Sequence, residues 1–168
     1  PRPATITGPR VYLRPPRIDD IGAFLAAVRG SRALHGPWTR PPDTKARYEA
    51  WVARYAARGD LPAHAAYLLF RQEDHALLGV FNFSEIVRGA FLSTYLGYMG
   101  FLPYAGKGYM TEGMALALDV AFRKLRLLSL VSLLWLIGLK QQCWLHAVAA
   151  VGDGAIRRGE LHWRDAHP

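Results

Sequence analysis

Residues 102–126 read LPYAGKGYMTEGMALALDVAFRKLR, which combines a glycine turn with a long helical pattern. Gly106 and Gly108 stand on either side of Lys107, and the helical pattern begins directly behind them. Apolar side chains then recur every three or four residues, which predicts a helix with one buried face. The members of this predicted face are Met110, Met114, Ala117, Leu118, Ala121, Phe122 and Leu125.

The charges of this helix and the glycines before it indicate an anion site. Two glycines at a helix start let several backbone N–H groups point outward at the positive end of the helix dipole. Glu112 lies in the first turn, and Arg123, Lys124 and Arg126 lie in the last, which is the order that the dipole favours. The pattern predicts a phosphate-binding turn, although a helix that simply begins after a flexible turn would look similar.

Two common phosphate-binding motifs are excluded by spacing. A P-loop has four residues between its first glycine and its Gly-Lys pair, whereas five residues separate Gly100 from Gly106. Gly108 also stands where a P-loop has its hydroxyl side chain. A dinucleotide fingerprint needs a third glycine where this chain has Thr111.

The turn resembles that of the GNAT acyltransferases, whose acetyl-CoA motif runs Gln/Arg-x-x-Gly-x-Gly/Ala. The sequence AGKGYM at 105–110 has both central glycines but lacks the leading Gln or Arg and the final small residue. GKGYMTEG at 106–113 is similar to Gly-x-Gly-x-Met-x-Glu-Ala of the RimJ/RimL group, which acetylates N-termini of ribosomal proteins. Upstream blocks at 10–15 and 79–98 follow in the family's order, so the resemblance covers about residues 10–127.

The resemblance implies acetyl-CoA as co-substrate and a protein N-terminus as the favoured acceptor amine. In this family the strand before the glycine turn diverges from its neighbour, and the pantetheine arm lies in the gap. Backbone groups at the end of that strand would contact the pantetheine, and those of the glycine turn would hold the pyrophosphate. The residues so assigned are Met99, Gly100, Phe101, Gly106, Lys107, Gly108, Tyr109, Met110 and Thr111.

Acetyl transfer to an amine requires a bound thioester, a neutral amine, an oxyanion donor and a proton for the leaving thiolate. A backbone N–H within 99–101 would be the oxyanion donor in the resembling fold. Glu85 is the carboxylate best placed to act as base, and Tyr98 is a candidate acid. An exposed loop glutamate and a packing tyrosine are the alternative interpretations of these two residues.

Hydrophobic patterning predicts a single α+β domain over residues 1–168, with a mixed, mostly antiparallel sheet flanked by helices. The expected order is a strand, two helices, three strands and then the glycine turn with its helix. The expected ranges are strands at 10–14, 65–71, 76–83 and 91–98, helices at about 20–30 and 44–59, and a loop at 31–43. The resembling fold has the same order.

After Leu127 the resemblance weakens, and residues 128–153 are interpreted as a diverged, frameshifted or misassigned segment. The family's Pro-x-Asn-x-x-Ser is absent, and Gly138 and Gln141 stand in its register. A buried strand near 130–136 and a helix near 139–151 are still expected. This departure keeps open a second class of function, a GNAT-like module that binds CoA without catalysis.

The amino-acid composition limits the remaining possibilities for location, partners and bound metals. The 168 residues include one cysteine, Cys143, so no disulfide framework exists and a cytoplasmic location is expected. The net charge of +8 suits an anionic cofactor or a ribosomal partner, and leaves a basic nucleic-acid-binding domain as a weaker alternative. The uncharged run 127–139 has 13 residues, too few for a membrane span. The six histidines show no metal-ligand spacing, so no metal is expected, and a homodimer is left open.

Overall fold

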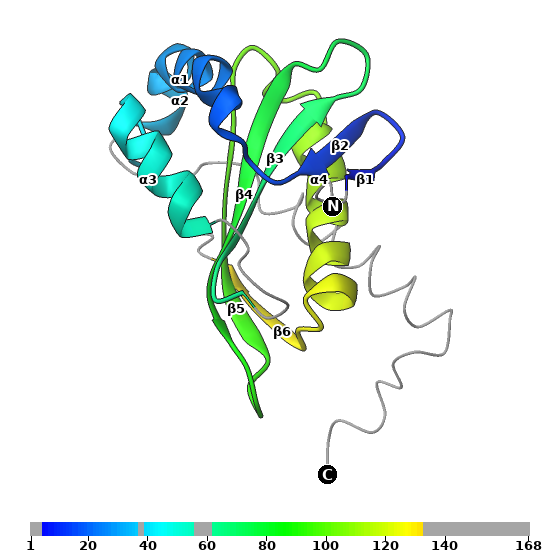
Figure 1. Cartoon of the computed structure of the whole chain (residues 1–168). Coiled ribbons are helices and arrows are strands. Elements are labelled where there is room, and N and C mark those ends of the chain that lie inside the picture. The colour runs from blue at the N-terminus through cyan, green and yellow to red at the C-terminus, as the bar shows by residue number, and fades with distance from the viewer. Residues whose placement is uncertain (1–4, 37–38, 56–61, 133–168) are drawn as a thin grey trace.

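The computed structural model describes residues 5–36, 39–55 and 62–132. A six-stranded sheet forms the centre of the molecule and helices cover both of its faces (Figure 1). The elements are β1 (Ile6–Thr7), β2 (Val11–Arg14), η1 (Ile18–Asp20), α1 (Ile21–Gly30), α2 (Arg32–His35), α3 (Lys45–Tyr55), β3 (Ala65–Arg71), β4 (Leu77–Val87), β5 (Ser93–Gly100), α4 (Tyr109–Asp119), η2 (Val120–Lys124) and β6 (Ser129–Ser132).

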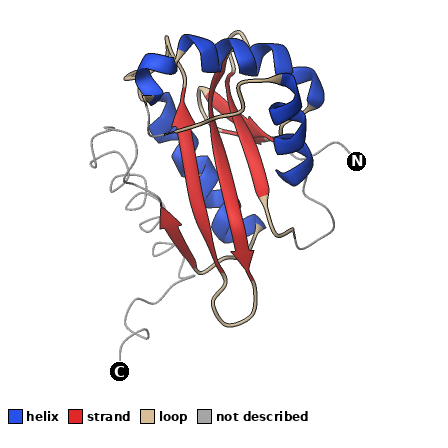
Figure 2. Cartoon of the chain, turned by 90° about the vertical axis from the view of Figure 1, so that its left-hand side faces the viewer, coloured by secondary structure: helices blue, strands red, loops and turns tan. Residues whose placement is uncertain are grey.

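The strands follow one another across the sheet in the order of the chain, from β1 to β6. Neighbours pair antiparallel except β5 and β6, which are parallel and are connected through α4. This mixed, mostly antiparallel sheet with flanking helices confirms the predicted α+β class. Figure 2 shows the long strands side by side, with helices in front of and behind them.

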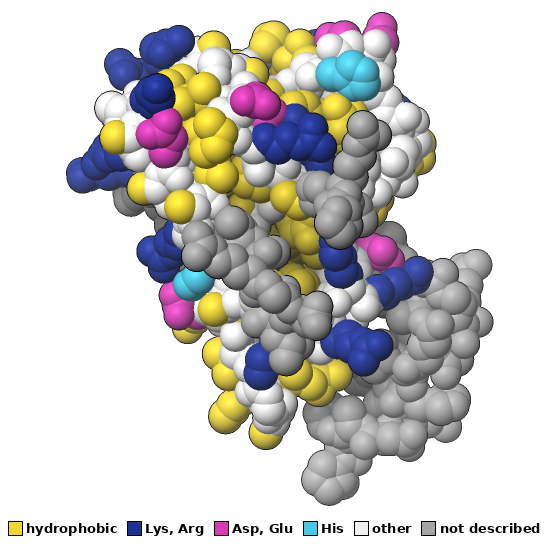
Figure 3. All heavy atoms as spheres, in the orientation of Figure 1, with side chains coloured by type: hydrophobic (Ala, Val, Ile, Leu, Met, Phe, Trp, Pro, Cys, Tyr) yellow, Lys and Arg dark blue, Asp and Glu magenta, His cyan; other side chains and the backbone are white. Residues whose placement is uncertain are grey.

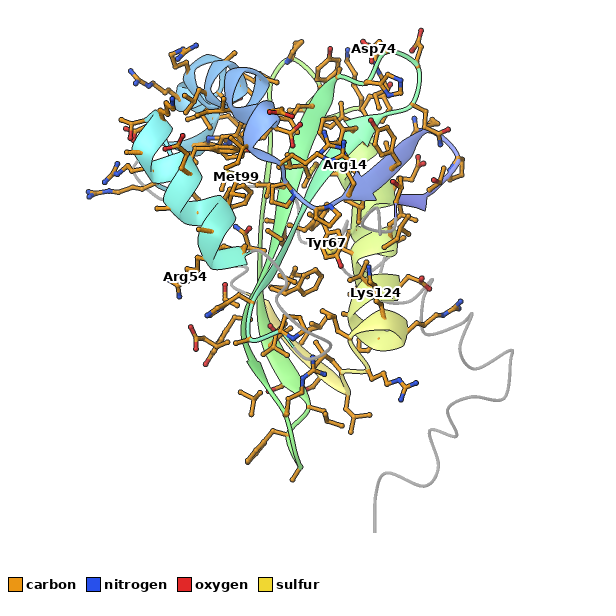
Figure 4. All side chains as sticks on the ribbon, viewed as in Figure 1. Arg14, Arg54, Tyr67, Asp74, Met99 and Lys124 are labelled. Carbon is orange, nitrogen blue, oxygen red and sulfur yellow. The ribbon has the colours of Figure 1, made fainter. Side chains whose placement is uncertain are left out.

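Each face of the sheet carries its own hydrophobic core. Buried residues on the α4 side include Val11, Leu13, Leu69, Phe81, Leu96, Met114 and Leu118. Buried residues on the side of α1 and α3 include Phe24, Val28, Tyr48, Leu68, Phe70, Val80 and Phe101. In Figure 4, Met99 lies on the α1–α3 side, whereas Tyr67 and Lys124 lie on the α4 side. Because β3 is covered on both faces, residues 65–70 are all buried and show no polar alternation.

The close packing of α4 on the sheet depends on a pair of facing glycines. Gly79 of β4 is the register partner of Gly100 of β5. A Cβ on Gly79 would lie 2.5 Å from the Met110 sulfur and 2.6 Å from the Met99 carbonyl oxygen. Any side chain there would therefore push the first turn of α4 away from the two strands.

Several predicted boundaries were wrong. The expected loop at 31–43 contains α2, β1 was not anticipated, and β5 runs from Ser93 to Gly100 instead of 91–98. Strand β4 extends to Val87, so Glu85 lies within an irregular part of a strand and not in a connection. The predicted helical face also fails at Phe122, which is 37% exposed. The π-helical segment η2 adds residues to that turn and so shifts the 3.6-residue period.

Some expectations lie outside the described residues. These are the continuation of the predicted strand at 133–136, Gly138, the helix near 139–151 with Gln141, and the end of the second predicted helix at Gly59. Within the described ranges, no helix combines the length and the apolar character needed to cross a membrane.

Candidate functional site

The glycine turn between β5 and α4 has the conformation that its sequence predicts. Gly106 and Gly108 have φ angles of +79° and +80°, which strain any residue that carries a Cβ. Gly108 is the N-cap of α4, and no side chain caps this end of the helix. The first helical hydrogen bond runs from the Glu112 N–H to the Gly108 carbonyl, at 3.2 Å. The preceding N–H groups therefore have no partner inside the helix, as an anion site requires.

A pocket of about 170 Å³ opens at this turn. Seven of the nine residues assigned to the cofactor line it, namely Gly100, Phe101, Gly106, Gly108, Tyr109, Met110 and Thr111. Leu34, His35, Leu78, Tyr104 and Ala105 complete the lining. Met99 and Lys107, which were also assigned to the cofactor, do not line this pocket. Most of the lining is apolar.

Three cations from different parts of the chain surround the turn. The Arg10 guanidinium lies 4.9 Å from the Tyr109 ring centroid, and its Nη2 is 3.6 Å from the position that a Cβ on Gly108 would take. Arg71 lies 5.0 Å from the centroid of the Tyr104 ring, and the Lys107 ammonium lies 5.7 Å from the same centroid. These cations add positive charge to a helix terminus that already attracts anions.

Two of these cations are held by carboxylates. Glu112 accepts hydrogen bonds from the Arg10 backbone N–H at 2.7 Å and from its Nε at 2.9 Å, and so links α4 to β2. Arg71 donates two hydrogen bonds to Asp74, at 2.8 and 2.6 Å. These bonds raise the pKa of Arg71 and lower the pKa of Asp74 to about 2. Both groups of this pair therefore stay charged at neutral pH.

The register of β5 decides which of its backbone groups face away from β4. The Phe101 N–H donates to the Leu78 carbonyl at 2.8 Å, so it is already paired. In an antiparallel ladder alternate residues point to opposite sides, and Gly100 therefore directs its N–H and carbonyl away from β4. The register thus favours Gly100 as the residue among 99–101 whose N–H can reach a ligand beside β5.

His35 and Ser31 hold this end of β5 in place. The buried His35 ring donates from Nε2 to the Gly100 carbonyl at 2.9 Å, and Ser31 Oγ accepts from the Leu102 N–H at 2.9 Å. Both residues come from the range that the sequence pattern assigned to a loop. Their role was not anticipated, because no local motif connects a histidine at 35 with a glycine at 100.

Glu85, the predicted base, lies at an irregularity in β4 with a φ of +51°. Its side chain is 60% exposed, 3.4 Å from Arg54 Nη2 and 4.0 Å from His64 Nε2. Its N–H donates to His64 Nδ1 at 3.3 Å. A polar cluster with an unusual backbone conformation is common at functional sites, and His64 was not singled out from the sequence.

Tyr98, the predicted acid, lies elsewhere on the sheet. It is the register partner of Phe81, and its half-buried ring packs beside the core on the α4 side. Glu85 is four positions after Phe81 along β4, which corresponds to about 13 Å. The structure therefore does not bring Tyr98 and Glu85 together, and their catalytic roles stay predictions.

No group of three or more His, Cys, Asp or Glu residues in the described part of the chain is arranged to hold a metal ion.

The family model of the acetyltransferase (GNAT) domain matches residues 10–138, which is most of the chain. The protein belongs to the GNAT acetyltransferase family. The match extends beyond residue 127, where the resemblance was expected to end, and includes Gly138. It confirms the predicted family and the expectation of an acetyltransferase.

Curated relatives of this GNAT protein are named as N-acetyltransferases. The probable N-acetyltransferase YjcK of Bacillus subtilis is 27% identical over 126 residues, covering 73% of this chain and 70% of that protein. The [ribosomal protein uS5]-alanine N-acetyltransferase of Escherichia coli is 33% identical over 86 residues, covering 49% of this chain and 44% of that protein. The chain thus aligns with less than half of the E. coli protein.

Solved structures of two ribosomal-protein or RimJ acetyltransferases and of a polyamine acetyltransferase have the same fold. The ribosomal-protein-S5-alanine acetyltransferase of Vibrio fischeri gives a TM-score of 0.72 at 16% identity, covering 89% of this chain and 82% of that one. RimJ of Mycobacterium smegmatis, in complex with CoA-disulfide, gives a TM-score of 0.71 at 20% identity, covering 89% of this chain and 75% of that one. Spermidine N-acetyltransferase of Vibrio cholerae, in complex with CoA and spermine, gives a TM-score of 0.64 at 15% identity, covering 85% of this chain and 80% of that one.

The donor set of this chain fits the cofactor of the family. CoA carries a pyrophosphate, and the uncapped N-terminus of α4 with Arg10, Arg71 and Lys107 is a suitable environment for such an anion. Acetyl-CoA as co-substrate agrees with the CoA-bound relatives. Ala105 stands where the family motif has its leading Gln or Arg, and in this chain Arg10, which directly precedes β2, and Arg71 of β3 lie near the turn.

Proposed function

We propose that this GNAT acetyltransferase transfers the acetyl group of acetyl-CoA to a primary amine, in particular to the N-terminal α-amine of a protein. The observation that carries the proposal is the pocket at the uncapped N-terminus of α4, which is lined by Gly100 and by Tyr104 and Tyr109, the two rings that the three cations contact. Direct attack of the amine within a ternary complex is the reaction that we propose, since no covalent enzyme intermediate is needed.

In this proposal the glycine turn binds the cofactor, and β5 stabilises the transition state. The N–H groups of residues 108–111 and the cations beside them bind the pyrophosphate. Bound acetyl-CoA supplies the activated acetyl thioester. The Gly100 N–H, which points away from β4, donates to the thioester oxygen as negative charge develops on it. His35 keeps this peptide in position through the neighbouring carbonyl. Such a donor contributes about 3 kcal/mol of transition-state stabilisation.

Glu85 and Tyr98 remain the proposed proton-transfer residues. Glu85 attracts the protonated amine of the acceptor. It lies six β4 positions, or about 20 Å, from Gly79, the register partner of Gly100, so the proton reaches it through a chain of waters. His64 and Arg54 orient the Glu85 carboxylate. Tyr98 supplies the proton for the leaving thiolate. Replacement of either residue should lower kcat more than it changes CoA affinity.

A protein N-terminus fits the acceptor side better than a polyamine does. Solved relatives include both ribosomal-protein acetyltransferases and a spermidine acetyltransferase. In this chain α3 presents Arg47 and Arg54 beside the surface that leads to Glu85, and these cations repel a polyamine. We further propose a cytoplasmic protein with one domain over residues 1–168, and we leave its oligomeric state to experiment.

The test is release of free CoA from acetyl-CoA in the presence of defined acceptors. Peptides beginning with Ala or Ser should be acetylated at the α-amine, and the same peptides with a blocked N-terminus should be inert. Mass spectrometry locates the acetyl group. Turnover of spermidine but of no peptide would overturn the proposed acceptor. Tight CoA binding without turnover of any amine would instead favour the CoA-binding module.

A further inference from the structure

We propose that a groove beside α3 selects acceptors with acidic residues a few positions after the acetylated N-terminus. The groove, called here the arginine groove, is defined by Arg40, Pro41, Arg47, Trp51, Arg54 and Tyr55, and its volume is about 380 Å³. It lies on a different part of the molecule from the pocket at the glycine turn, with no lining residue in common. The inference rests on the proposed function, because it names the class of protein N-terminus that the enzyme accepts.

The spacing of residues on α3 creates the cationic side of the groove. Arg47, Trp51 and Arg54 are four and three residues apart, so they lie on one helix face. Figure 4 shows Arg54 near the C-terminal end of α3. Lys45 and Glu49 form an ion pair on the opposite face of the helix. The positive charge of the groove is therefore not a property of the whole surface of α3.

The arginines are accessible to a partner. The side chains of Arg47 and Arg54 are 64% and 59% exposed, although each has one carboxylate neighbour, Asp43 at 2.9 Å and Glu85 at 3.4 Å. Arg40 is exposed and forms no ion pair with the described residues. In Figure 3 the side of the molecule formed by α1–α3 shows Lys and Arg side chains interspersed with a few acidic ones.

One end of the groove meets the proposed catalytic region. Arg54, which lines the groove, contacts Glu85. Tyr55, the next lining residue, shares a hydrogen bond of 2.7 Å with Ser84 Oγ and packs its ring against His64. A carboxylate thus stands at one end of the surface and arginines extend along it.

This charge order matches a free protein N-terminus followed by acidic residues. The protonated α-amine is attracted to Glu85, and downstream carboxylates are attracted to the arginines. A uniform polyanion such as RNA matches less well, because its phosphates would also meet Glu85 and Asp43. Trp51 and the prolines add apolar surface for the peptide between its charges.

Helix geometry predicts where the acidic residue should be. Arg54 is seven positions after Arg47 on α3, which corresponds to about 10.5 Å along the helix axis. An extended peptide covers about 3.3–3.6 Å per residue, so about three residues span this distance. A peptide whose amine lies near Glu85 therefore places its third or fourth side chain near Arg47, and later side chains approach Arg40.

The experiment compares peptides that begin with the same Ala or Ser and carry Glu, Gln or Lys at positions three and four. Binding of labelled peptides is measured by fluorescence anisotropy with CoA present, and acetylation is measured in parallel. We expect about a two- to five-fold lower Kd and KM for each favourable Glu, since exposed ion pairs are weak. The preference should decrease as salt is raised.

Two charge reversals on the same helix provide the matched test. Arg47→Glu should reverse the preference, so that Lys peptides bind better than Glu peptides. Lys45→Glu, on the other face of α3, should leave the Glu preference unchanged. Equal affinity for all peptides, or the same response in both variants, would overturn the inference.

The outcomes also separate this inference from the proposed function. Peptides acetylated without regard to their third and fourth residues would refute the arginine groove but retain N-terminal acetylation. Acidic peptides that bind through Arg47 but are never acetylated would refute the function and retain the groove. Displacement of these peptides by single-stranded RNA at lower concentration, sensitive to Arg47→Glu, would show that the groove binds nucleic acid and overturn the inference.

Discussion

Replacing Glu112 with glutamine would test how the first turn of α4 is held against β2. The Glu112 carboxylate accepts hydrogen bonds from the Arg10 N–H at 2.7 Å, the Arg10 Nε at 2.9 Å and the Val11 N–H at 3.2 Å. Glutamine has nearly the same shape and keeps Oε1 as an acceptor for both backbone groups. Its NH2 group, however, faces the Arg10 Nε–H, so one charge-assisted hydrogen bond is lost.

The size of the effect follows from these contacts. A hydrogen bond to a charged group contributes about 1.5–3 kcal/mol, and the Arg10 side chain is 54% exposed, which places this one at the lower end. We therefore expect Glu112→Gln to lower the free energy of unfolding by about 1–2 kcal/mol. Glu112→Ala should cost about 3 kcal/mol, because both backbone N–H groups then lose their acceptor as well.

Urea unfolding followed by circular dichroism measures this difference. With a slope of about 2 kcal/mol per molar urea, Glu112→Gln should lower the midpoint by about 0.5–1 M. Glu49→Gln is the matched control, because its ion pair with Lys45 is exposed and 3.9 Å long, and should change stability by less than about 0.5 kcal/mol. If Glu112→Gln behaved like Glu49→Gln, or if alanine were no worse than glutamine, the proposed link between α4 and β2 would be wrong.

Three further predictions concern other parts of the site and the core. Gly108→Val should weaken CoA binding at least about tenfold in calorimetric titration. The reason is that a β-branched residue resists a φ of +80° and so moves the N-terminus of α4. Unchanged CoA affinity would contradict the assigned turn. Gly113→Val should lower Tm by about 4–8 °C, since even its Cβ would lie 2.7 Å from a Leu69 methyl group, and an unchanged Tm would mean that Leu69 can move aside. Asp74 should titrate at about 2 in NMR experiments and near the ordinary value of about 4 in Arg71→Gln. The pair stabilises the folded state fully above the pKa that Asp74 has in the unfolded chain. This stabilisation is lost as the pH falls toward the lower pKa of Asp74 in the folded protein. A wild-type pKa near 4 would contradict the pairing.

Features that depend on local sequence could be predicted. The period of apolar residues in α4, the run of six buried residues in β3 and the polar turn between β3 and β4 each have their cause within a few neighbouring residues. The same holds for the glycine turn, because positive φ angles at Gly106 and Gly108 need glycine wherever the rest of the chain lies. The fold class and the position of the pocket at the glycine turn follow from these elements.

Features that depend on convergence of distant segments could not be predicted. Arg10, Arg71 and His35 reach the glycine turn or the end of β5 only after the sheet has formed, and no spacing in the sequence indicates this. The irregularity of β4 at Glu85 depends on its register with β5, and so does the assignment of Gly100 as the outward N–H. In these cases pairing across the sheet decides the role of a residue, and local propensity does not.

The order of strands in the sheet has a consequence for synthesis on the ribosome. Because every strand lies beside its sequence neighbour, a growing chain can add β2, β3, β4 and β5 to the sheet as each one emerges. The contact between Arg10 and Glu112 spans 102 residues and forms only after α4 has emerged. The anion site is therefore completed only after β1 to β5 have emerged, and a nascent chain that has built most of its sheet does not yet have it.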